Sequence, residues 1–89
     1  MTLNHKEIGH RIAKIRLENG LTQEKLARTL NISTEHLGRI ETGKRSVSIE
    51  LLADLSFYFN VSTDYILFGK FVKPNEIKLS LRKIICNLS

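Results

Sequence analysis

The chain has 89 residues, which suffices for one domain with a modest hydrophobic core and leaves no length for a separate catalytic domain. Lysine and arginine number 14 against 9 acidic residues. The resulting charge of +5 favours a polyanionic partner, such as DNA, RNA or an acidic membrane surface, without choosing among them. A single cysteine excludes an internal disulfide framework. The sequence has no signal-peptide pattern and no apolar run near the ~18 residues of a membrane span, so we predict a cytoplasmic protein without membrane contact.

Start and stop signals predict five short helices before residue 70. A side chain able to accept a backbone hydrogen bond precedes each helix, in chain order Asn4, Thr22, Ser33, Ser48 and Ser62. An acidic residue then follows within the first turn, where the helix dipole favours negative charge, in the order Glu7, Glu24, Glu35, Glu50 and Asp64. Each helix is expected to end at a residue that tolerates a left-handed backbone, namely Gly20, Asn31, Gly43, Asn60 and Gly69.

Apolar residues recur at helical spacing in the first four of these segments. They form the stripes Ile8, Ile12 and Ile15; Leu26 and Leu30; Leu37 and Ile40; and Ile49, Leu52, Leu55 and Phe59. No segment shows the alternation of a half-buried strand. We therefore predict an all-α fold, a compact five-helix bundle.

The second and third predicted helices have the spacing of a helix-turn-helix over residues 22–43. Ala27 is small and lies between apolar residues, which lets the third helix pack closely. Asn31 can take the positive φ of the sharp turn, and Leu37 and Ile40 fix the third helix against the core.

A sixth, amphipathic helix is predicted after Pro74. Its apolar seam recurs at intervals of four, three and four residues, at Ile77, Leu81, Ile84 and Leu88. We therefore divide the chain into a helix-turn-helix domain over residues 1–70 and a C-terminal extension over residues 71–89. The seam either pairs with its mate in a dimer or packs back on the bundle.

From Ile8 to Gly69 the chain resembles the phage-repressor (Cro or Xre-type) family of transcriptional regulators. The resemblance runs through Arg11-Ile12, Arg16, Leu21-Thr22-Gln23, Leu26-Ala27, Ile40-Glu41, Gly43-Lys44-Arg45, Leu51-Leu52, Asn60-Val61-Ser62 and Asp64-Tyr65-Ile66-Leu67. It implies a bundle whose third helix enters the DNA major groove, usually in a homodimer that reads a pseudo-palindromic operator. Two positions depart from the pattern. Asn31 stands where glycine is common, and Gly38 lies within the third helix, where glycine costs about 1 kcal/mol relative to alanine; it either permits close approach to DNA or is a loose position.

The outward side of the third helix holds the candidate base-reading residues. A helical wheel places Glu35 and Arg39 opposite Leu37 and Ile40, and the resemblance implies that Thr34, Glu35 and Arg39 touch base edges. Arg39 can donate to guanine, Glu35 can accept from cytosine N4, and Thr34 can contact a thymine methyl or a phosphate. The alternative is an ordinary solvated helix face, and it weighs more for Glu35 because phosphate repels its charge.

Contacts to the DNA phosphates are expected from Gln23 at the start of the second helix and from Thr42, Lys44 and Arg45 after the third. Such contacts set affinity and salt dependence rather than sequence preference. Three further basic residues are interpreted as ordinary solvated charges: Arg11, Lys14 and Arg28.

Arg16 and Glu41 are opposite charges on the apolar sides of the first and third helices, which predicts that they pair. The family carries an ion pair at the matching positions. Its role would be to hold orientation, since a partly buried pair need not add net stability. Two unrelated surface charges are the alternative.

The remaining residues predict no enzyme, no cofactor and no metal site. His5, His10, His36 and Cys86 lack a zinc spacing, and no phosphate loop or nucleophile elbow stands out. The aromatic residues are expected in core or dimer contacts rather than in an RNA-stacking platform: Phe57, Tyr58, Phe59, Tyr65, Phe68 and Phe71. The predicted function is sequence-specific binding of double-stranded DNA by a homodimeric repressor; the alternative is an antitoxin-like or anti-repressor-like protein-interaction module.

Overall fold

The structure is a computed structural model that describes residues 3–70, and within that part of the chain it contains five α-helices and no strand. Their bounds are α1 His5–Glu18, α2 Gln23–Leu30, α3 Thr34–Glu41, α4 Ile49–Phe59 and α5 Thr63–Phe68. The predicted all-α bundle is confirmed. The C-terminal helix predicted after Pro74, with its seam, lies outside the described residues.

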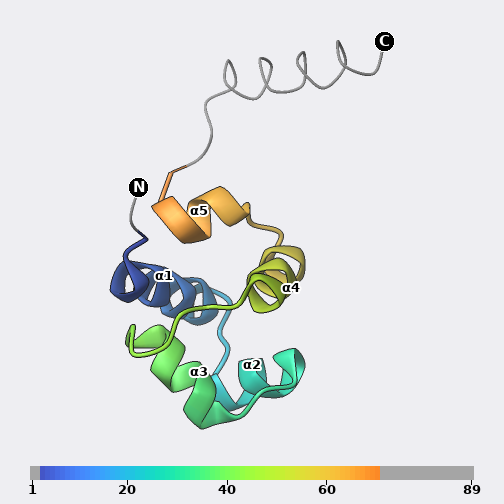
Figure 1. The fold of residues 1–89 in the computed structure, drawn as a ribbon. Helices are drawn as coiled ribbons and strands as arrows, with labels where there is room; N and C mark the ends of the chain where they lie inside the picture. Colours follow the sequence, from blue (N-terminus) through green and yellow to red (C-terminus); the bar gives the residue numbers. More distant parts are fainter. Residues whose placement is uncertain (1–2, 71–89) are drawn as a thin grey trace.

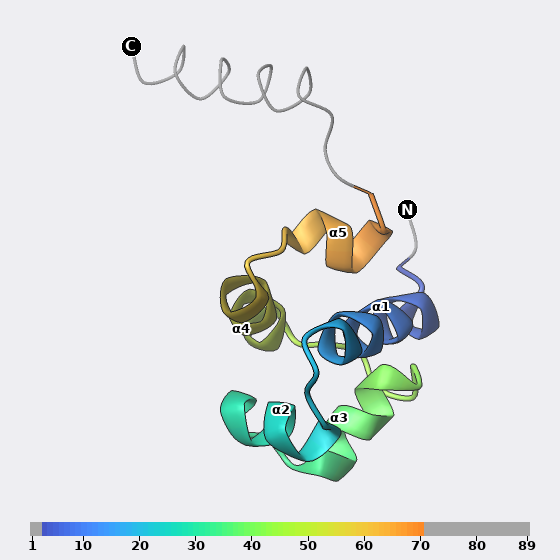
Figure 2. The same ribbon diagram turned by 180° about the vertical axis from the view of Figure 1, so that it is seen from behind.

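Helix α1 occupies the middle of the bundle. It packs against α3 and α5, while α4 packs against α5 and α2 (Figure 1). Figure 2 shows the same arrangement from behind, with α2 and α3 together at the end of the domain opposite α5. The helix-turn-helix therefore forms one end of the molecule.

Each helix begins at the residue that the sequence indicates. The side-chain oxygens of Asn4, Thr22, Ser33, Ser48 and Ser62 accept hydrogen bonds of 3.0 to 3.1 Å from the backbone N–H three residues further on. A cap of this kind typically stabilises a helix by about 1 kcal/mol. The predicted stops are confirmed too, because φ is positive at Gly20, Asn31, Gly43, Asn60 and Gly69.

The buried core contains the predicted stripes, with one correction in α4 and with Ile66 of α5, which no predicted stripe included. Its most buried members are Ile8, Ile12, Leu26, Leu37, Ile40, Leu55 and Ile66. The prediction that Ile49 belongs to the α4 stripe is wrong, because its exposed fraction is 86% and Leu51 is buried instead. Leu51, Leu55 and Phe59 recur every four residues, and Ile49 falls on nearly the opposite side of the helix from Leu51.

Glycine allows α1 to lie directly against the end of α3. A Cβ atom at Gly9 would lie 2.1 Å from the carbonyl oxygen of Ile40, and one at Gly43 would lie 2.6 Å from the Cα of Lys6. These distances leave no room for a side chain at either position. The C-terminal end of α3 is thus fixed against the backbone of α1.

Arg11 ties α1 to the last turn of α5, and its interpretation as a solvated charge is wrong. Its Nε donates to the carbonyl oxygen of Ile66 at 2.8 Å, and its Nη2 donates to that of Leu67 at 2.7 Å. Carbonyl groups at a helix C-terminus lack partners within the helix, and they carry the negative end of its dipole. The guanidinium of Arg11 supplies these carbonyl groups with hydrogen-bond donors and with a positive charge.

Candidate nucleic-acid interface

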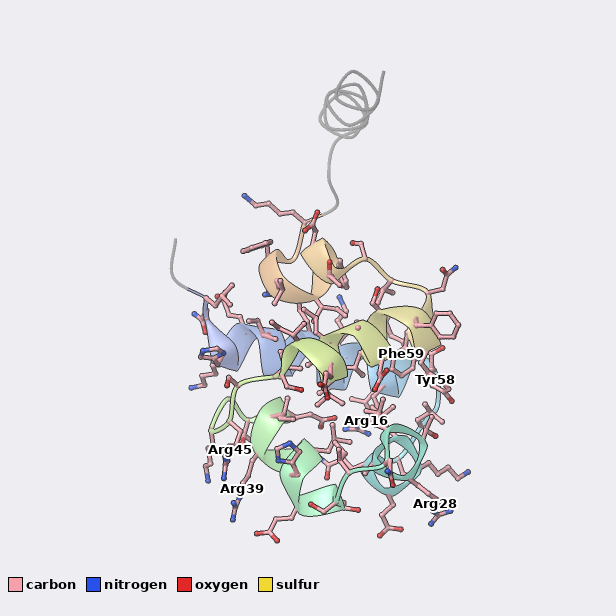
Figure 3. All side chains as sticks on the ribbon, turned by 45° about the vertical axis from the view of Figure 1, so that its right-hand side comes forward. Arg16, Arg28, Arg39, Arg45, Tyr58 and Phe59 are labelled. Carbon is pink, nitrogen blue, oxygen red and sulfur yellow. The ribbon has the colours of Figure 1, made fainter. Side chains whose placement is uncertain are left out.

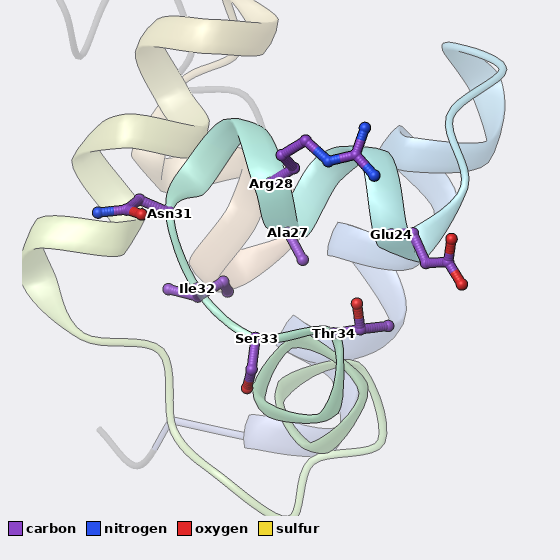
Figure 4. A pocket seen from close by; sticks show the side chains of 7 residues that line it. All are labelled: Glu24, Ala27, Arg28, Asn31, Ile32, Ser33 and Thr34. Carbon is purple, nitrogen blue, oxygen red and sulfur yellow. The ribbon is translucent and has the colours of Figure 1, made fainter.

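The turn between α2 and α3 has the geometry that the sequence predicts. Asn31 ends α2 in the left-handed region, at φ 58° and ψ 43°, and the N–H of Ile32 donates to the carbonyl of Ala27 at 2.9 Å. Ala27 itself is buried, so its small side chain lets the start of α3 approach α2. A groove of about 430 Å³ follows this turn, lined by Glu24, Ala27, Arg28, Asn31, Ile32, Ser33 and Thr34 (Figure 4).

Helix α3 presents the three candidate base-reading residues to solvent. Thr34, Glu35 and Arg39 are all exposed, whereas Leu37 and Ile40 on the other side are almost completely buried. Burial of one face holds the helix in a single rotational setting, which fixes what the other face displays. All three residues are therefore accessible: Glu35 and Arg39 share one face of α3, and Thr34, at the start of the helix, lines the grooves toward α2.

Glu35 and Arg39 are bonded to each other across one turn of this surface. The Nη2 of Arg39 donates to Oε1 of Glu35 at 2.7 Å, and the exposed fractions of the two side chains are 50% and 76%. The sequence interpretation treats both residues as readers and misses the pair. The missed signal is the acid-to-base spacing of four residues, which brings side chains together on a helix.

Arg16 and Glu41 form the expected ion pair in the interior of the same end of the domain. The Nε of Arg16 lies 2.8 Å from Oε2 of Glu41, and its Nη2 lies 3.1 Å from Oε1. The exposed fractions of the side chains are only 11% and 5%, so the contact is bidentate and largely dry. Arg16 also donates to the carbonyl of Leu21 at 2.9 Å, which fixes the loop before α2.

Gln23, expected to contact phosphate, joins this network instead of projecting freely. Its Nε2 donates to Oε1 of Glu41 at 2.9 Å. The amide is thereby held at the start of α2, in a second groove that it lines with Arg16, Thr22, Glu24 and Thr34. The ion pair, the start of α2 and the end of α3 are therefore one connected polar unit.

The remaining candidate phosphate contacts cluster just after α3. The backbone N–H groups of Lys44 and Arg45 donate to the carbonyl of Arg39 at 2.9 and 3.2 Å, and Oγ1 of Thr42 donates to the carbonyl of Gly38 at 3.0 Å. Thr42, Lys44 and Arg45 are exposed. Figure 3 shows Arg39 and Arg45 projecting from the same end of the domain.

Charge is distributed unevenly between the two halves of the described chain. Between residues 46 and 69 there is no lysine, arginine or histidine, and the charged residues are Glu50, Asp54 and Asp64. All lysines and arginines before Lys70 lie in α1, α2, α3 and the loop after it. A polyanion is therefore attracted to the α1–α3 half and repelled by the α4–α5 half.

The aromatic residues of α4 and α5 divide into inner and outer members. Phe59 and Tyr65 pack against the core, as expected. The rings of Tyr58 and Phe59 are arranged edge to face, with their centroids 4.8 Å apart. Phe57, Tyr58 and Phe68 are exposed, at 88%, 47% and 42%, so they lie outside the core, and the expected dimer contact stays a prediction for them. Phe57 lies two residues from buried Leu55 and therefore on the outer side of α4.

Residues 3–70 contain no group of three or more histidine, cysteine or acidic side chains placed to hold a metal ion. None of the helices in this part of the chain has the length and apolar character needed to cross a membrane.

In this chain a short turn at Asn31 joins α2 to α3, one face of α3 is exposed, and basic residues follow the helix. This arrangement is that of the class of helix-turn-helix DNA-binding domains. The sequence model of a family described as helix-turn-helix matches residues 12–66. The chain belongs to this family.

Individual relatives agree with the assignment. ImmR, an HTH-type transcriptional regulator of Bacillus subtilis, is 39% identical over 74 residues, which are 81% of this chain and 58% of that protein. Antitoxin PezA of Streptococcus pneumoniae is 40% identical over 70 residues, which are 78% of this chain and 44% of that protein. The crystal structure of the restriction-modification controller protein C.AhdI of Aeromonas hydrophila superposes with a TM-score of 0.64 at 26% identity, covering 70% of this chain and 94% of that one. The chain spans little more than half the length of ImmR and less than half that of PezA.

Proposed function

We propose that this protein binds double-stranded DNA sequence-specifically and represses transcription as a homodimer on a pseudo-palindromic operator. The observation that carries the proposal is the exposed face of α3, where Thr34, Glu35 and Arg39 stand above a buried Leu37 and Ile40. The naming of ImmR as a transcriptional regulator and of C.AhdI as a controller protein supports it. Such a regulator acts in the cytoplasm, where bacterial DNA is.

The reading face fits the chemistry of base edges in the major groove, which is wide enough to admit an α-helix. The guanidinium of Arg39 offers paired donors to O6 and N7 of guanine. The carboxylate of Glu35 offers an acceptor to cytosine N4, and Thr34 offers a methyl and a hydroxyl group. The orientation of α3 depends on Arg16 and Glu41, which join it to α1 and to the loop before α2.

Contacts to the phosphates come from the two sides of α3. Lys44 and Arg45 supply charge after the helix, and Thr42 supplies a hydroxyl. Gln23 and the N-terminus of α2 supply N–H donors, and the side chain of Gln23 is already oriented by Glu41. These contacts set register and affinity without reading sequence.

Dimerisation is assigned to the apolar seam of residues 71–89, namely Ile77, Leu81, Ile84 and Leu88. In a symmetric dimer the two copies of α3 would read half-sites about one helical turn of DNA apart, roughly 34 Å. Two domains also double the number of phosphate contacts, which strengthens the dependence of binding on salt.

Selection of binding sites from a library of random duplexes tests the proposal. We expect an enriched pseudo-palindrome whose binding weakens steeply with salt. Arg39→Ala should lower discrimination at one base pair per half-site by about 1–3 kcal/mol, whereas Lys44→Ala should weaken all sequences similarly and reduce the salt slope by about 1. No enrichment of any sequence would refute the proposal.

A second candidate function is that of an antitoxin-like or anti-repressor-like module that binds another protein. The likeness to antitoxin PezA favours it, and the exposed Ile49 and Phe57 on α4 would serve as contact surface. Purification from the source cell distinguishes the candidates. A stoichiometric protein partner that is lost in an Ile49→Ser, Phe57→Ser variant would favour this module, and DNA binding that survives in the same variant would favour the regulator.

A further inference from the structure

We infer that Glu35 is a positioning residue for Arg39, which sets the sequence preference of the reading face without itself reading a base. This inference rests on the proposed function and replaces one part of it, the contact of Glu35 with cytosine N4. It assigns to the carboxylate two effects: it holds the guanidinium of Arg39 in place, and it opposes binding to DNA backbone.

The geometry supports a holding role. The contact between Oε1 of Glu35 and Nη2 of Arg39 is 2.7 Å long, and it is the only hydrogen bond or ion pair of this guanidinium within residues 3–70. One nitrogen of the fork is thereby occupied. The other N–H groups of Arg39 stay available for the paired acceptors O6 and N7 of guanine.

The residue that precedes Arg39 in α3 carries no side chain. This residue is Gly38, and the nearest atom to a Cβ built there is Nε2 of Gln23, 4.0 Å away. Leu37 and Ile40 point into the core. These three neighbours in sequence offer Arg39 no polar partner, and the bond to Glu35 is the polar contact that restricts its guanidinium.

An exposed ion pair of this spacing adds little to the stability of the fold, because solvent and salt screen it. Its larger effect is on binding, because ordering a long side chain at an interface opposes association. An arginine already held in its binding conformation avoids this penalty, which corresponds to about 2-fold to 12-fold in affinity.

The charge of Glu35 has a separate effect on sequences that Arg39 does not match. Its carboxylate is 76% exposed on the surface that meets DNA, so it repels phosphates whatever the base sequence. Where guanine is present, the hydrogen bonds of Arg39 to O6 and N7 offset this repulsion. Where it is absent, only the repulsion remains, and the ratio of specific to non-specific affinity rises.

A double-mutant cycle on the selected duplex tests the inference in the full-length protein. Binding of the wild type, Glu35→Ala, Arg39→Ala and the double variant is measured on the selected site and on sites that carry each substitution at the base pair read by Arg39. We expect Arg39→Ala to lower discrimination there by about 5-fold to 140-fold and Glu35→Ala to lower it by about 2-fold to 12-fold at the same base pair. The double variant should discriminate at this base pair as Arg39→Ala does, because Glu35 acts on discrimination through Arg39, while its binding to all sequences should be stronger because the repulsive charge is gone.

Two further variants separate holding from repulsion. Glu35→Gln keeps an acceptor oxygen at the same reach, so it should restore part of the discrimination while non-specific binding stays above that of the wild type. Glu24→Ala is the matched control, since Glu24 is also an exposed acid in the first turn of a helix in this end of the domain and makes no side-chain bond within residues 3–70. It should raise non-specific binding and leave base discrimination unchanged.

A loss of discrimination at a different base pair in Glu35→Ala, additive with Arg39→Ala, would overturn the inference and make Glu35 a direct reader. Unchanged discrimination in Glu35→Ala would also overturn it. A wild-type protein that enriches no duplex would refute the proposed function itself, which separates that failure from the others.

Discussion

Gly38 and Gly9 are interior glycines of α3 and α1 with opposite surroundings, and replacing each with alanine should change stability in opposite directions. At Gly38 the added methyl would meet no atom closer than Nε2 of Gln23 at 4.0 Å. The substitution therefore gains helix propensity, about 0.8–1 kcal/mol, without a clash. For a domain of this size a gain of 1 kcal/mol raises Tm by about 4–8 °C.

At Gly9 the same methyl would lie 2.1 Å from the carbonyl oxygen of Ile40 and 2.6 Å from that of Glu41. Both atoms are backbone, so α1 must move away from α3 as a whole. Overpacking of this kind costs about 1–3 kcal/mol, and because no side chain can rotate away we expect the upper part of that range, a net loss of about 2 kcal/mol after the gain in propensity.

Thermal and urea unfolding of the wild type and both variants, followed by circular dichroism, measures the two effects under one set of conditions. A lower Tm for Gly38→Ala, or an unchanged Tm for Gly9→Ala, would refute the packing described for α1 and α3. Binding of Gly38→Ala to the selected duplex then settles why glycine stands there. Weaker binding by a more stable protein indicates that DNA approaches the backbone at this position.

Three further substitutions test the other contacts. Glu41→Ala should destabilise the protein by about 3–5 kcal/mol, because it leaves Arg16 buried and uncompensated, and urea unfolding should show less loss in a double variant with Arg16→Met. Arg11→Ala should lower the free energy of unfolding by about 1.5–3 kcal/mol by removing the charged hydrogen bonds to α5, and the salt slope of DNA binding should not change if Arg11 touches no phosphate. Leu81→Asp should convert a dimer to a monomer in sedimentation at tens of micromolar if the seam dimerises; a wild-type protein that is already monomeric there contradicts that assignment.

The helix boundaries could be predicted because their causes are local. A capping side chain and the N–H that it accepts from are three residues apart. Asn31 and Asn60 have positive φ, which asparagine tolerates whatever its neighbours are. The exposed face of α3 follows from the same local periodicity, since burial of Leu37 dictates where Arg39 points. For these features the printed sequence contains all the determinants.

The features that could not be predicted depend on partners distant in the chain or on a choice between equal patterns. Arg11 looks like any surface arginine until α5, 55 residues later, brings the carbonyl of Ile66 to it. The sequence around Gly9 does not indicate that glycine is required there, because the requirement comes from the close approach of α3. Ile49 and Leu51 are both plausible first members of the α4 stripe, and only the position of the neighbouring helices selects Leu51.

The two sides of α1 have a mechanical consequence for the whole molecule. One side meets α3 through backbone at Gly9, and the other holds the carbonyl groups of α5 through Arg11. Helix α1 is therefore a strut between the end of α3 and Gly69, the residue that caps α5. In a dimer joined through residues 71–89, the length of this strut would set how far each reading helix stands from the symmetry axis, so operator spacing would depend on a helix that touches no base.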